Sequence, residues 1–470
     1  MDNLVFTGIA PHPPLIVPEV GGKEREKAKA TCKAMEEWAQ LVKDKLPDSI
    51  VLVSPHGTVF QDAITINEEQ EVSGSLAQFG ALQVKLSFST DVELAAAIRQ
   101  MSGRHNVPVV GLDKALAKKH GARQDLDHGA LVPLYYLDTA GVRCQLVSVS
   151  MGLLPFEDLY AFGLAVQQAA RLLDKRVVMV ASGDLSHRLT PEAPAGYSPE
   201  GRKFDDLLVQ AVREFKVEDI LEIDRELGEN AGECGLRPII MMLGALDGMD
   251  VESRVLSYEG PFGVGYLVAG FTPQGLNPEQ ELLRKLLDKR GARVKERRAR
   301  ESEPVSIARE SLEHYIIHGE PLFAREGEQP PAGLAGRAGV FVSIKRHGQL
   351  RGCIGTTAPT QADILAEIRH NAISAGTRDP RFWPVEEAEL ADLVYSVDIL
   401  KEPEAIDGME QLDTQKYGVI VRSGNKAGLL LPNLEGVDTV EEQVAIAKQK
   451  AGIGPDEPCR LERFEVVRYH

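Results

Sequence analysis

The chain has 470 residues, of which 43% are hydrophobic and 26% charged, and its formal net charge is −17. This length exceeds one ordinary hydrophobic core and predicts two or three domains, and the composition is typical of a globular protein. No segment approaches about 18 consecutive apolar residues, so no membrane span is expected, and the acidic balance argues against nucleic acid as a general partner.

The cysteines and the N-terminus indicate the cellular compartment. The five cysteines form no CxxC pair: Cys32, Cys144, Cys234, Cys353 and Cys459. This scatter argues against a disulfide framework or a zinc ribbon and predicts a protein of the reducing cytoplasm. The N-terminus leads directly into a strand without a basic segment, so no signal peptide is expected.

Residues 1–275 alternate predicted strands and helices. Residues 1–18 contain a strand and a Pro-rich loop, residues 23–46 have the apolar spacing of a helix, and SIVLVSPHG (49–57) is a second strand. This order is a βαβ unit and implies parallel pairing. Because similar strands and helices continue to about residue 275, we predict an α/β domain with a central, largely parallel sheet flanked by helices.

Three histidines follow predicted strands of this domain. His12 lies in LVFTGIAPHPP, His56 in SIVLVSPHG and His187 in RVVMVASGDLSHRL. Ligands of open α/β sheets bind at the carboxyl ends of the strands, so the three histidines indicate a common site. A fourth, His128, precedes Gly129 at the predicted start of a helix.

Two imidazoles and one carboxylate are the ligand set of non-haem Fe(II) oxygenases, which leaves coordination positions for oxygen and substrate. We expect His12 and His56 to be the imidazole ligands, and Glu233 in AGECGLRP to be the carboxylate. Glu259 in SYEGPFG is a competing carboxylate, although an acid in a Gly/Pro turn is more often a turn residue.

Histidines that do not bind the metal remain available for proton transfer, because imidazole titrates near neutral pH. His128 and His187 fit that role, and Asp184 is placed to orient His187 from the same loop.

The composition changes after residue 275. Residues 276–303 are rich in charge and predict a linker that is helical in its first half. Residues 304–470 open with an amphipathic helix, continue with a hairpin around His347-Gly348, and mix strands and helices irregularly. This pattern predicts a second domain of the α+β class.

The second domain contains four candidate functional residues. Cys353 in LRGCIG is a candidate nucleophile, although a small residue packed in a strand is the favoured interpretation because buried free cysteines are usually inert. Arg351, Asp379 and Arg381 are expected either to line a polar groove or to form a structural network of ion pairs.

The N-terminal 275 residues resemble the catalytic, LigB-type subunit of class III extradiol ring-cleavage dioxygenases. The matching segments surround His12, His56, His128 in DHG-ALVPL, His187 in SGDLSHRL and Glu233. The resemblance implies Fe(II) bound by His12, His56 and Glu233, with His187 as acid/base and His128 near a substrate hydroxyl. It also implies O2-dependent cleavage of a small catechol-type aromatic, and an oligomer.

The segment ECGLRPI also resembles the MEMO family, which shares this fold and uses a cysteine in place of the carboxylate ligand. Glu233 and Cys234 are neighbours, and one turn presents only one of them comfortably to a given metal. A thiolate prefers softer metals and weakens the case for oxygen chemistry. Glu233 is favoured because the other segments match the dioxygenases, and Cys234 remains the alternative.

Residues 304–470 resemble the AMMECR family through LRGCIG, RDPRFWPV and YSVDILKEPEAI. AMMECR-type, MEMO-type and radical-SAM proteins occur together as the AmmeMemoRadiSam group, which implies a radical-SAM protein as partner. Two hypotheses follow from the resemblances. The chain is an Fe(II)-dependent ring-cleaving dioxygenase with an AMMECR domain, or a MEMO-like metal-binding protein without dioxygenase activity.

Overall fold

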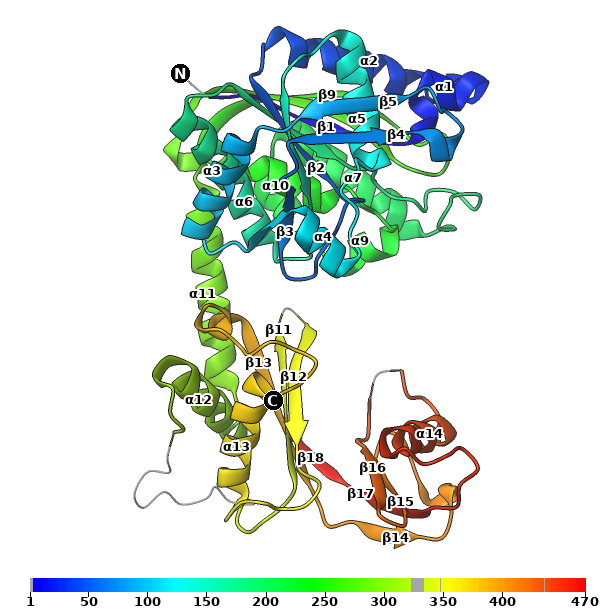
Figure 1. Ribbon diagram of the computed structural model, residues 1–470, viewed down its shortest axis with the longest axis vertical. Coiled ribbons are helices and arrows are strands. Elements are labelled where there is room, and N and C mark those ends of the chain that lie inside the picture. Colours follow the sequence, from blue (N-terminus) through cyan, green and yellow to red (C-terminus); the bar gives the residue numbers. More distant parts are fainter. Residues whose placement is uncertain (1–2, 323–333, 347, 435) are drawn as a thin grey trace. The chain divides into compact units, whose positions relative to one another are not determined.

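The structure is a computed structural model that describes residues 3–322, 334–346, 348–434 and 436–470 (Figure 1). The chain divides into two compact units, Met1–Lys289 and Arg290–His470. Each unit contains hydrophobic clusters of its own.

An eight-stranded sheet forms the centre of the N-terminal unit, in the order β6-β3-β7-β2-β8-β1-β10-β9. Strands β7, β2, β8 and β1 are parallel, whereas β3 and β10 run antiparallel to β7 and β1. The predicted largely parallel sheet is therefore confirmed. The strands of this unit are β1 (Leu4–Ala10), β2 (Ser49–Ser54), β3 (Ile64–Asn67), β4 (Glu71–Ser75), β5 (Lys85–Ser89), β6 (Val109–Leu112), β7 (Gln145–Ser150), β8 (Val177–Ser182), β9 (Met249–Glu259) and β10 (Tyr266–Leu276).

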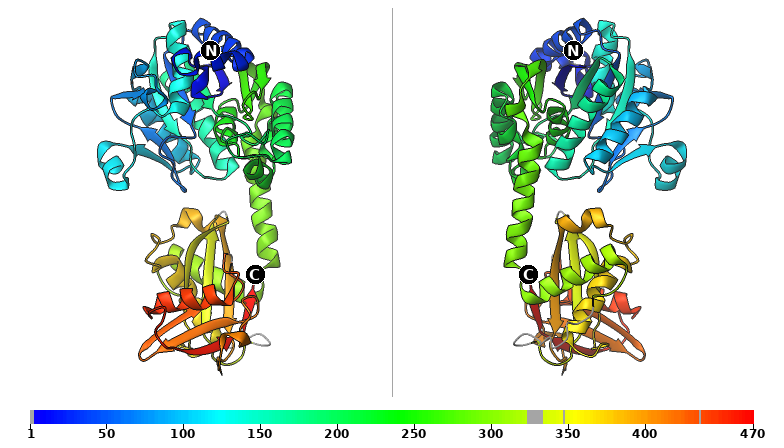
Figure 2. Two further views of the ribbon diagram at one scale, coloured as in Figure 1. Left: turned by 90° about the vertical axis from the view of Figure 1, so that its right-hand side faces the viewer. Right: turned by 90° about the vertical axis from the view of Figure 1, so that its left-hand side faces the viewer.

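Helices cover both faces of this sheet, as Figures 1 and 2 show. Ile50 and Leu52 of β2 enter the cluster that includes Trp38 of α2, whereas Val51 and Val53 enter the cluster on the other face. Burial on both faces explains why the central strands are apolar throughout. The helices are α1 (Pro18–Gly21), α2 (Lys29–Asp44), α3 (Val92–Arg104), α4 (Lys114–His120), α5 (His128–Ala140), α6 (Phe156–Leu173), α7 (Pro199–Glu214), α8 (Val217–Leu221), α9 (Arg225–Ala231) and α10 (Leu236–Gly244).

The strand order refines the predicted βαβ unit. Strands β1 and β2 do not pair with each other, because β8 lies between them and is parallel to both. This insertion places the carboxyl ends of β1, β8 and β2 side by side at one edge of the sheet. The segments that follow these strands carry His12, His187 and His56.

Two four-stranded sheets, β12-β11-β13-β18 and β14-β17-β15-β16, form the C-terminal unit together with helices. All of their pairings are antiparallel, and β11 and β12 form the expected hairpin, whose His347 lies outside the described residues. The strands are β11 (Val340–Arg346), β12 (Gln349–Gly355), β13 (Leu393–Leu400), β14 (Glu404–Ile406), β15 (Gly418–Ser423), β16 (Lys426–Leu430), β17 (Arg460–Phe464) and β18 (Val466–Tyr469). The helices are α12 (Glu303–His318), α13 (Ile364–Thr377) and α14 (Val440–Ala451).

The charged segment expected to be a half-helical linker is helical over most of its length. Helix α11 (Leu282–Arg300) includes the boundary between the two units. Its second half consists mainly of good helix formers, and its arginines bind other parts of the C-terminal unit. Arg290 pairs with Asp392, and Arg298 pairs with Glu313 at 2.5 Å. These partners are distant in sequence, so the composition alone did not reveal them.

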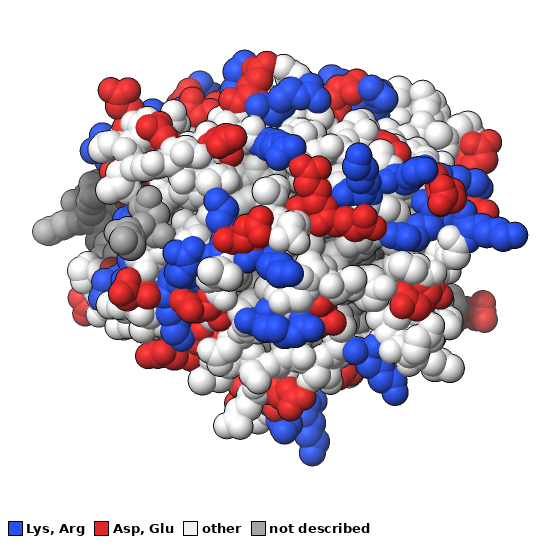
Figure 3. Space-filling view, turned by 90° about the horizontal axis from the view of Figure 1, so that it is seen from above, with Lys and Arg blue, Asp and Glu red and all other residues white. Residues whose placement is uncertain are grey.

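Basic and acidic side chains are interspersed on the face of the molecule in Figure 3. In the part of the chain that the structure describes, no helix combines the length and apolarity needed to cross a bilayer.

Candidate metal centre

The ends of β1 and β2 bring His12 and His56 into direct contact. Their Nε2 atoms lie 3.0 Å apart, and His12 is only 2% exposed. The ligand nitrogens of His12, His56 and His128 all lie within 4.8 Å of one another. Three of the four histidines selected from the sequence therefore form one cluster at the carboxyl edge of the sheet.

His128 joins this cluster from the first turn of α5. The Asp127 side chain caps that helix by accepting a hydrogen bond from Ala130 N, and it also accepts one at 2.6 Å from Oγ of Ser54, the last residue of β2. Asp127 thus ties the start of α5 to the end of β2. The rings of His56 and His128 stack with centroids 4.5 Å apart.

A close approach at Gly129 makes this stacking possible. A Cβ atom at Gly129 would lie 2.5 Å from Ser54 Oγ and 3.4 Å from His56 Cδ2. Because the first of these distances is too short for a real contact, a larger residue next to His128 would have to displace the Ser54 side chain that binds Asp127.

Ser182 determines which nitrogen of His12 carries a proton. The Ser182 hydroxyl donates to the carbonyl oxygen of Gly129, and its oxygen lies 2.9 Å from His12 Nδ1. A hydroxyl has one proton to donate, so Ser182 accepts a hydrogen bond from His12 Nδ1–H. The lone pair of His12 is therefore on Nε2, which faces His56. A partner on the far nitrogen is the usual arrangement for metal-binding histidines.

Burial keeps all four histidines neutral. It lowers the pKa of His12 well below its ordinary value, with the neighbouring imidazoles adding to the effect, and it lowers the pKa of His56 to about 4. Burial also lowers the pKa of His128 and of His187. Metals bind the neutral form of imidazole, so the cluster is in the protonation state that a metal requires.

Glu233 and Cys234 have different partners. The Glu233 carboxylate accepts a hydrogen bond from Leu236 N at 2.6 Å and caps α10. The Cys234 thiol instead lies 3.7 Å from His12 Nε2. One oxygen of Glu233 is therefore engaged at the helix start while the thiol of its neighbour faces the histidines, and Glu233 as the metal ligand stays a prediction.

Two glycines set the position of Cys234. A Cβ atom at Gly183 would lie 2.2 Å from the Cα of Gly235, so the loop after β8 and the turn before α10 touch through their backbones. This contact places Cys234 against Asp184: Cys234 N donates to the Asp184 carbonyl at 3.3 Å, and Asp184 N donates to Cys234 Sγ at 3.4 Å. Burial raises the pKa of the Cys234 thiol well above its usual range.

Asp184 is directed toward His12, whereas the sequence predicted that it orients His187. Its Oδ1 accepts a hydrogen bond from His12 N at 2.9 Å, and its Oδ2 lies 3.9 Å from His12 Nε2. Burial raises the pKa of this carboxyl to about 7.

The His187 loop is held by another acid. The Asp205 carboxylate accepts hydrogen bonds from Ser186 N at 2.8 Å and from Tyr258 Oη at 2.6 Å. Ser186 precedes His187, and the proximity of His187 contributes to the lowered pKa values of His12 and His56. The fourth histidine therefore lies within electrostatic range of the cluster.

Glu259, the competing candidate for the carboxylate ligand, binds the start of a helix. It accepts hydrogen bonds from Thr31 N and Thr31 Oγ1 at 2.7 and 2.6 Å and so holds the start of α2. Glu259 is the last residue of β9 and pairs with Tyr266 of β10, so it belongs to a strand and not to the turn that the sequence suggested.

The distances in the cluster fit a shared ion. Two nitrogen ligands bound at about 2.1 Å lie about 3.0 to 3.4 Å apart, and a sulfur ligand bound at about 2.3 Å lies about 3.6 Å from a nitrogen. The Nε2 atoms of His12 and His56 are 3.0 Å apart, and Cys234 Sγ is 3.7 Å from His12 Nε2. His12, His56 and His128 are thus spaced to hold a metal, and Cys234 and Asp184 both approach Nε2 of His12.

In the C-terminal unit, Asp379 and Arg381 bind the free edge of β12. Cys353 N donates to Asp379 Oδ2 at 2.9 Å, and Arg381 donates to the Cys353 carbonyl at 3.4 Å and to Asp379 at 2.7 Å. Asp379 and Arg381 thus bind the N–H and the carbonyl of Cys353, two of the backbone groups that an edge strand leaves unpaired.

Arg351 binds the segment that follows Arg381, which contains Trp383 and Glu389. It donates to both carboxylate oxygens of Glu389 at 2.8 and 2.9 Å and to the Trp383 carbonyl at 2.9 Å. Arg351, Asp379 and Arg381 thus form an ion-pair network around the loop that contains Trp383, while the half-buried Cys353 thiol accepts a hydrogen bond from Ser343 Oγ at 3.2 Å.

Sequence reasoning missed Ser182, Asp127 and Asp205. Ser182 and Asp127 each stand next to a selected motif, in SGD and DHG, and their helix-capping and hydroxyl chemistry was a usable signal. Asp205 lies in α7 with no local signal, because its partners Ser186 and Tyr258 are distant in sequence.

Comparison with known families assigns both units. Residues 7–269 match the family of the catalytic LigB subunit of aromatic ring-opening dioxygenase, and residues 305–470 match AMMECR1. A protein of Clostridium acetobutylicum is 41% identical over 466 residues, which is 98% of each chain.

Two further relatives each match about a third of the chain. A Thermotoga maritima protein is 51% identical over 160 residues, covering 34% of this chain and 91% of that protein. A crystal structure of an uncharacterized protein from Pyrococcus horikoshii is 31% identical with a TM-score of 0.33, covering 35% of this chain and 88% of that one. From the match over residues 7–269, the chain belongs to the LigB family of aromatic ring-opening dioxygenase subunits, with an AMMECR1 domain fused to it.

Proposed function

We propose that the N-terminal unit binds Fe(II) and uses O2 to open the ring of a catechol-type aromatic. The observation that carries this proposal is the pair of neutral imidazoles, His12 and His56, whose Nε2 atoms lie 3.0 Å apart at the carboxyl edge of the sheet. Membership of the LigB family supports it.

His12 and His56 are the two imidazole ligands in this proposal. The third ligand is Cys234 or the Asp184 carboxylate, because both lie within 4 Å of His12 Nε2 whereas Glu233 caps α10. Bound Fe(II) would supply positions at which the substrate hydroxyls and O2 meet.

His187 and His128 are the proton-transfer groups of the proposal. Because burial lowers both pKa values, each imidazole is neutral near pH 7 and can accept a proton from a substrate hydroxyl. The Phe79 ring lies 5.5 Å from the His128 ring and provides an apolar surface for an aromatic substrate.

A second candidate function is MEMO-like metal binding without dioxygenase activity, in a pathway with a radical-SAM partner. The position of Cys234 favours it, since Sγ lies 3.7 Å from His12 Nε2 and a thiolate ligand suits softer metals than a carboxylate does. Both functions use His12 and His56 as metal ligands, but only the dioxygenase consumes O2.

Metal analysis of protein purified without air, followed by an assay with catechols, tests the proposal. We expect about one iron per chain, lost in His12→Ala and His56→Ala and retained in the control His105→Ala, whose side chain contacts Gln168. The iron-loaded protein should then give a yellow ring-opened product from catechols and O2. Iron at full occupancy without that product would reject the dioxygenase and leave the metal-binding alternative.

A further inference from the structure

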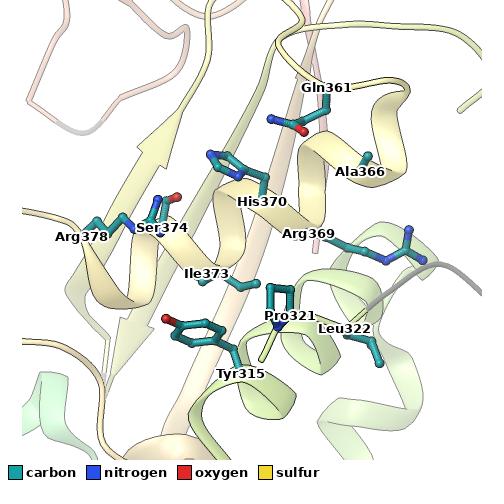
Figure 4. Close-up of a pocket in the computed structure, with 10 residues that line it drawn as sticks. All are labelled: Tyr315, Pro321, Leu322, Gln361, Ala366, Arg369, His370, Ile373, Ser374 and Arg378. Carbon is teal, nitrogen blue, oxygen red and sulfur yellow. The ribbon is translucent and has the colours of Figure 1, made fainter. Parts of the chain in front are cut away.

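A cavity of about 300 Å³ lies on the C-terminal unit between the end of α12 and one face of α13 (Figure 4). Its volume is at the lower end of the range for pockets that bind small molecules. None of its lining residues belongs to the ion-pair network around Trp383 or to the LigB unit.

One row of α13 forms a long side of this cavity. Ala366, His370 and Ser374 line it at intervals of four residues, the spacing that places side chains on one helix face. Arg378, the residue that follows the end of α13, also lines it. Figure 4 shows Tyr315 and Pro321 entering from the α12 side. Two elements far apart in the sequence thus enclose the same space.

Nitrogen donors are the polar groups at one end of the cavity. The chain as a whole has a formal charge of −17, whereas the described lining includes Arg378 and His370 and no aspartate or glutamate. Within the described part of the chain, no carboxylate pairs with Arg378 or His370. The Arg378 guanidinium, with no described carboxylate beside it, favours an anionic ligand.

The rest of the lining is apolar. Tyr315, Pro321, Leu322 and Ile373 contribute an aromatic ring and aliphatic carbon, and Ile373 is 8% exposed. Such a surface stabilises a ligand body by removing apolar area from water. A simple inorganic anion would leave this part of the cavity unused.

We propose that this cavity binds a small organic acid, with its carboxylate at Arg378 and His370 and its apolar or aromatic body against Tyr315 and Ile373. The site is independent of the metal chemistry proposed for the LigB unit. Arg378 supplies the charge-assisted hydrogen bonds and the Tyr315 ring supplies selectivity for an aromatic body.

Ligand-observed NMR titration of the full-length, metal-free chain tests this site with three probes: benzoate, inorganic phosphate and benzyl alcohol. Benzoate should bind with a Kd on the order of 1 mM, as expected for a ligand of that size, and the other two at least about tenfold more weakly, because each lacks the charge or the ring.

Variants locate the binding. Arg378→Gln and Tyr315→Ala should each weaken benzoate binding by about tenfold, whereas the exposed control Arg460→Gln should bind benzoate like the wild type. Unchanged thermal midpoints would show that the variants are folded; a variant that does not fold is replaced by His370→Gln. Phosphate binding as tight as benzoate binding, or benzoate binding unchanged in Arg378→Gln and Tyr315→Ala, would overturn the proposal.

Discussion

Cys234 Sγ lies 3.7 Å from His12 Nε2, while the carboxylate of the adjacent Glu233 accepts a hydrogen bond from Leu236 N. Two neighbouring residues of one turn therefore have separate tasks. Glu233 stabilises the start of α10, and Cys234 is the one that reaches the histidines.

Substitutions at Cys234 and at Glu233 should differ in their effect on metal binding. Cys234→Ala removes the thiol beside His12, so we expect metal content to fall well below one per chain. Glu233→Gln keeps an oxygen that can accept the hydrogen bond from Leu236 N, so we expect metal content to remain. Elemental analysis of both proteins checks this, and loss of metal in Glu233→Gln alone would contradict the geometry.

Ser182 should matter for metal affinity although it is not a ligand. Ser182→Ala removes the acceptor for His12 Nδ1–H and the donor to the Gly129 carbonyl. We expect metal affinity to fall by about 10-fold to 100-fold, measured by competition with a chelator, together with a changed visible spectrum of the Co(II)-loaded protein. Ser148→Ala is the control: it lies on β7, which β2 separates from β8, and it should leave both unchanged. Equal affinity in Ser182→Ala would show that the tautomer is set by other means.

Local patterns predicted the strands and the histidines that follow them, because each apolar run and its His are close in sequence. The order of the strands in the sheet could not be predicted in this way. The insertion of β8 between β1 and β2 is a non-local pairing, and no local pattern encodes it. The same limit applies to the choice between Glu233 and Cys234, which depends on a backbone contact between Gly183 and Gly235.

That backbone contact can be tested directly. Gly183→Ala would place a Cβ atom 2.2 Å from the Cα of Gly235, and backbone atoms on both sides cannot move freely. We expect a loss of about 1–3 kcal/mol in the free energy of unfolding and a lower metal content, since Cys234 and Asp184 would be pushed apart.

The matched control for this change is Gly103→Ala in α3, where an added Cβ meets no atom within 4 Å. Because alanine is the better helix former, this variant should be more stable by about 0.5–1 kcal/mol. Urea unfolding and metal analysis of both variants check the pair. A Gly183→Ala protein as stable and as metal-rich as the wild type would show that the two loops need not touch.

The ion-pair network of the C-terminal unit predicts a dependence of stability on pH. Hydrogen bonds from Arg381, and then from Cys353 N, lower the pKa of Asp379 to about 2, compared with about 3.9 for an unfolded chain. A carboxyl with a depressed pKa stabilises the folded state fully above about pH 4, and this contribution is lost as the pH falls from about 4 to about 2.

Asp379→Asn should therefore lower the melting temperature of the C-terminal unit at pH 6, and the difference from the wild type should shrink as the pH falls below about 4. Differential scanning calorimetry of the full-length chain at a series of pH values measures both transitions. The transition of the LigB unit is the internal control, because Asp379 and its partners Cys353 and Arg381 belong to the other unit. A difference that stays constant down to pH 3 would show that the charge of Asp379 is not what holds its loop on β12.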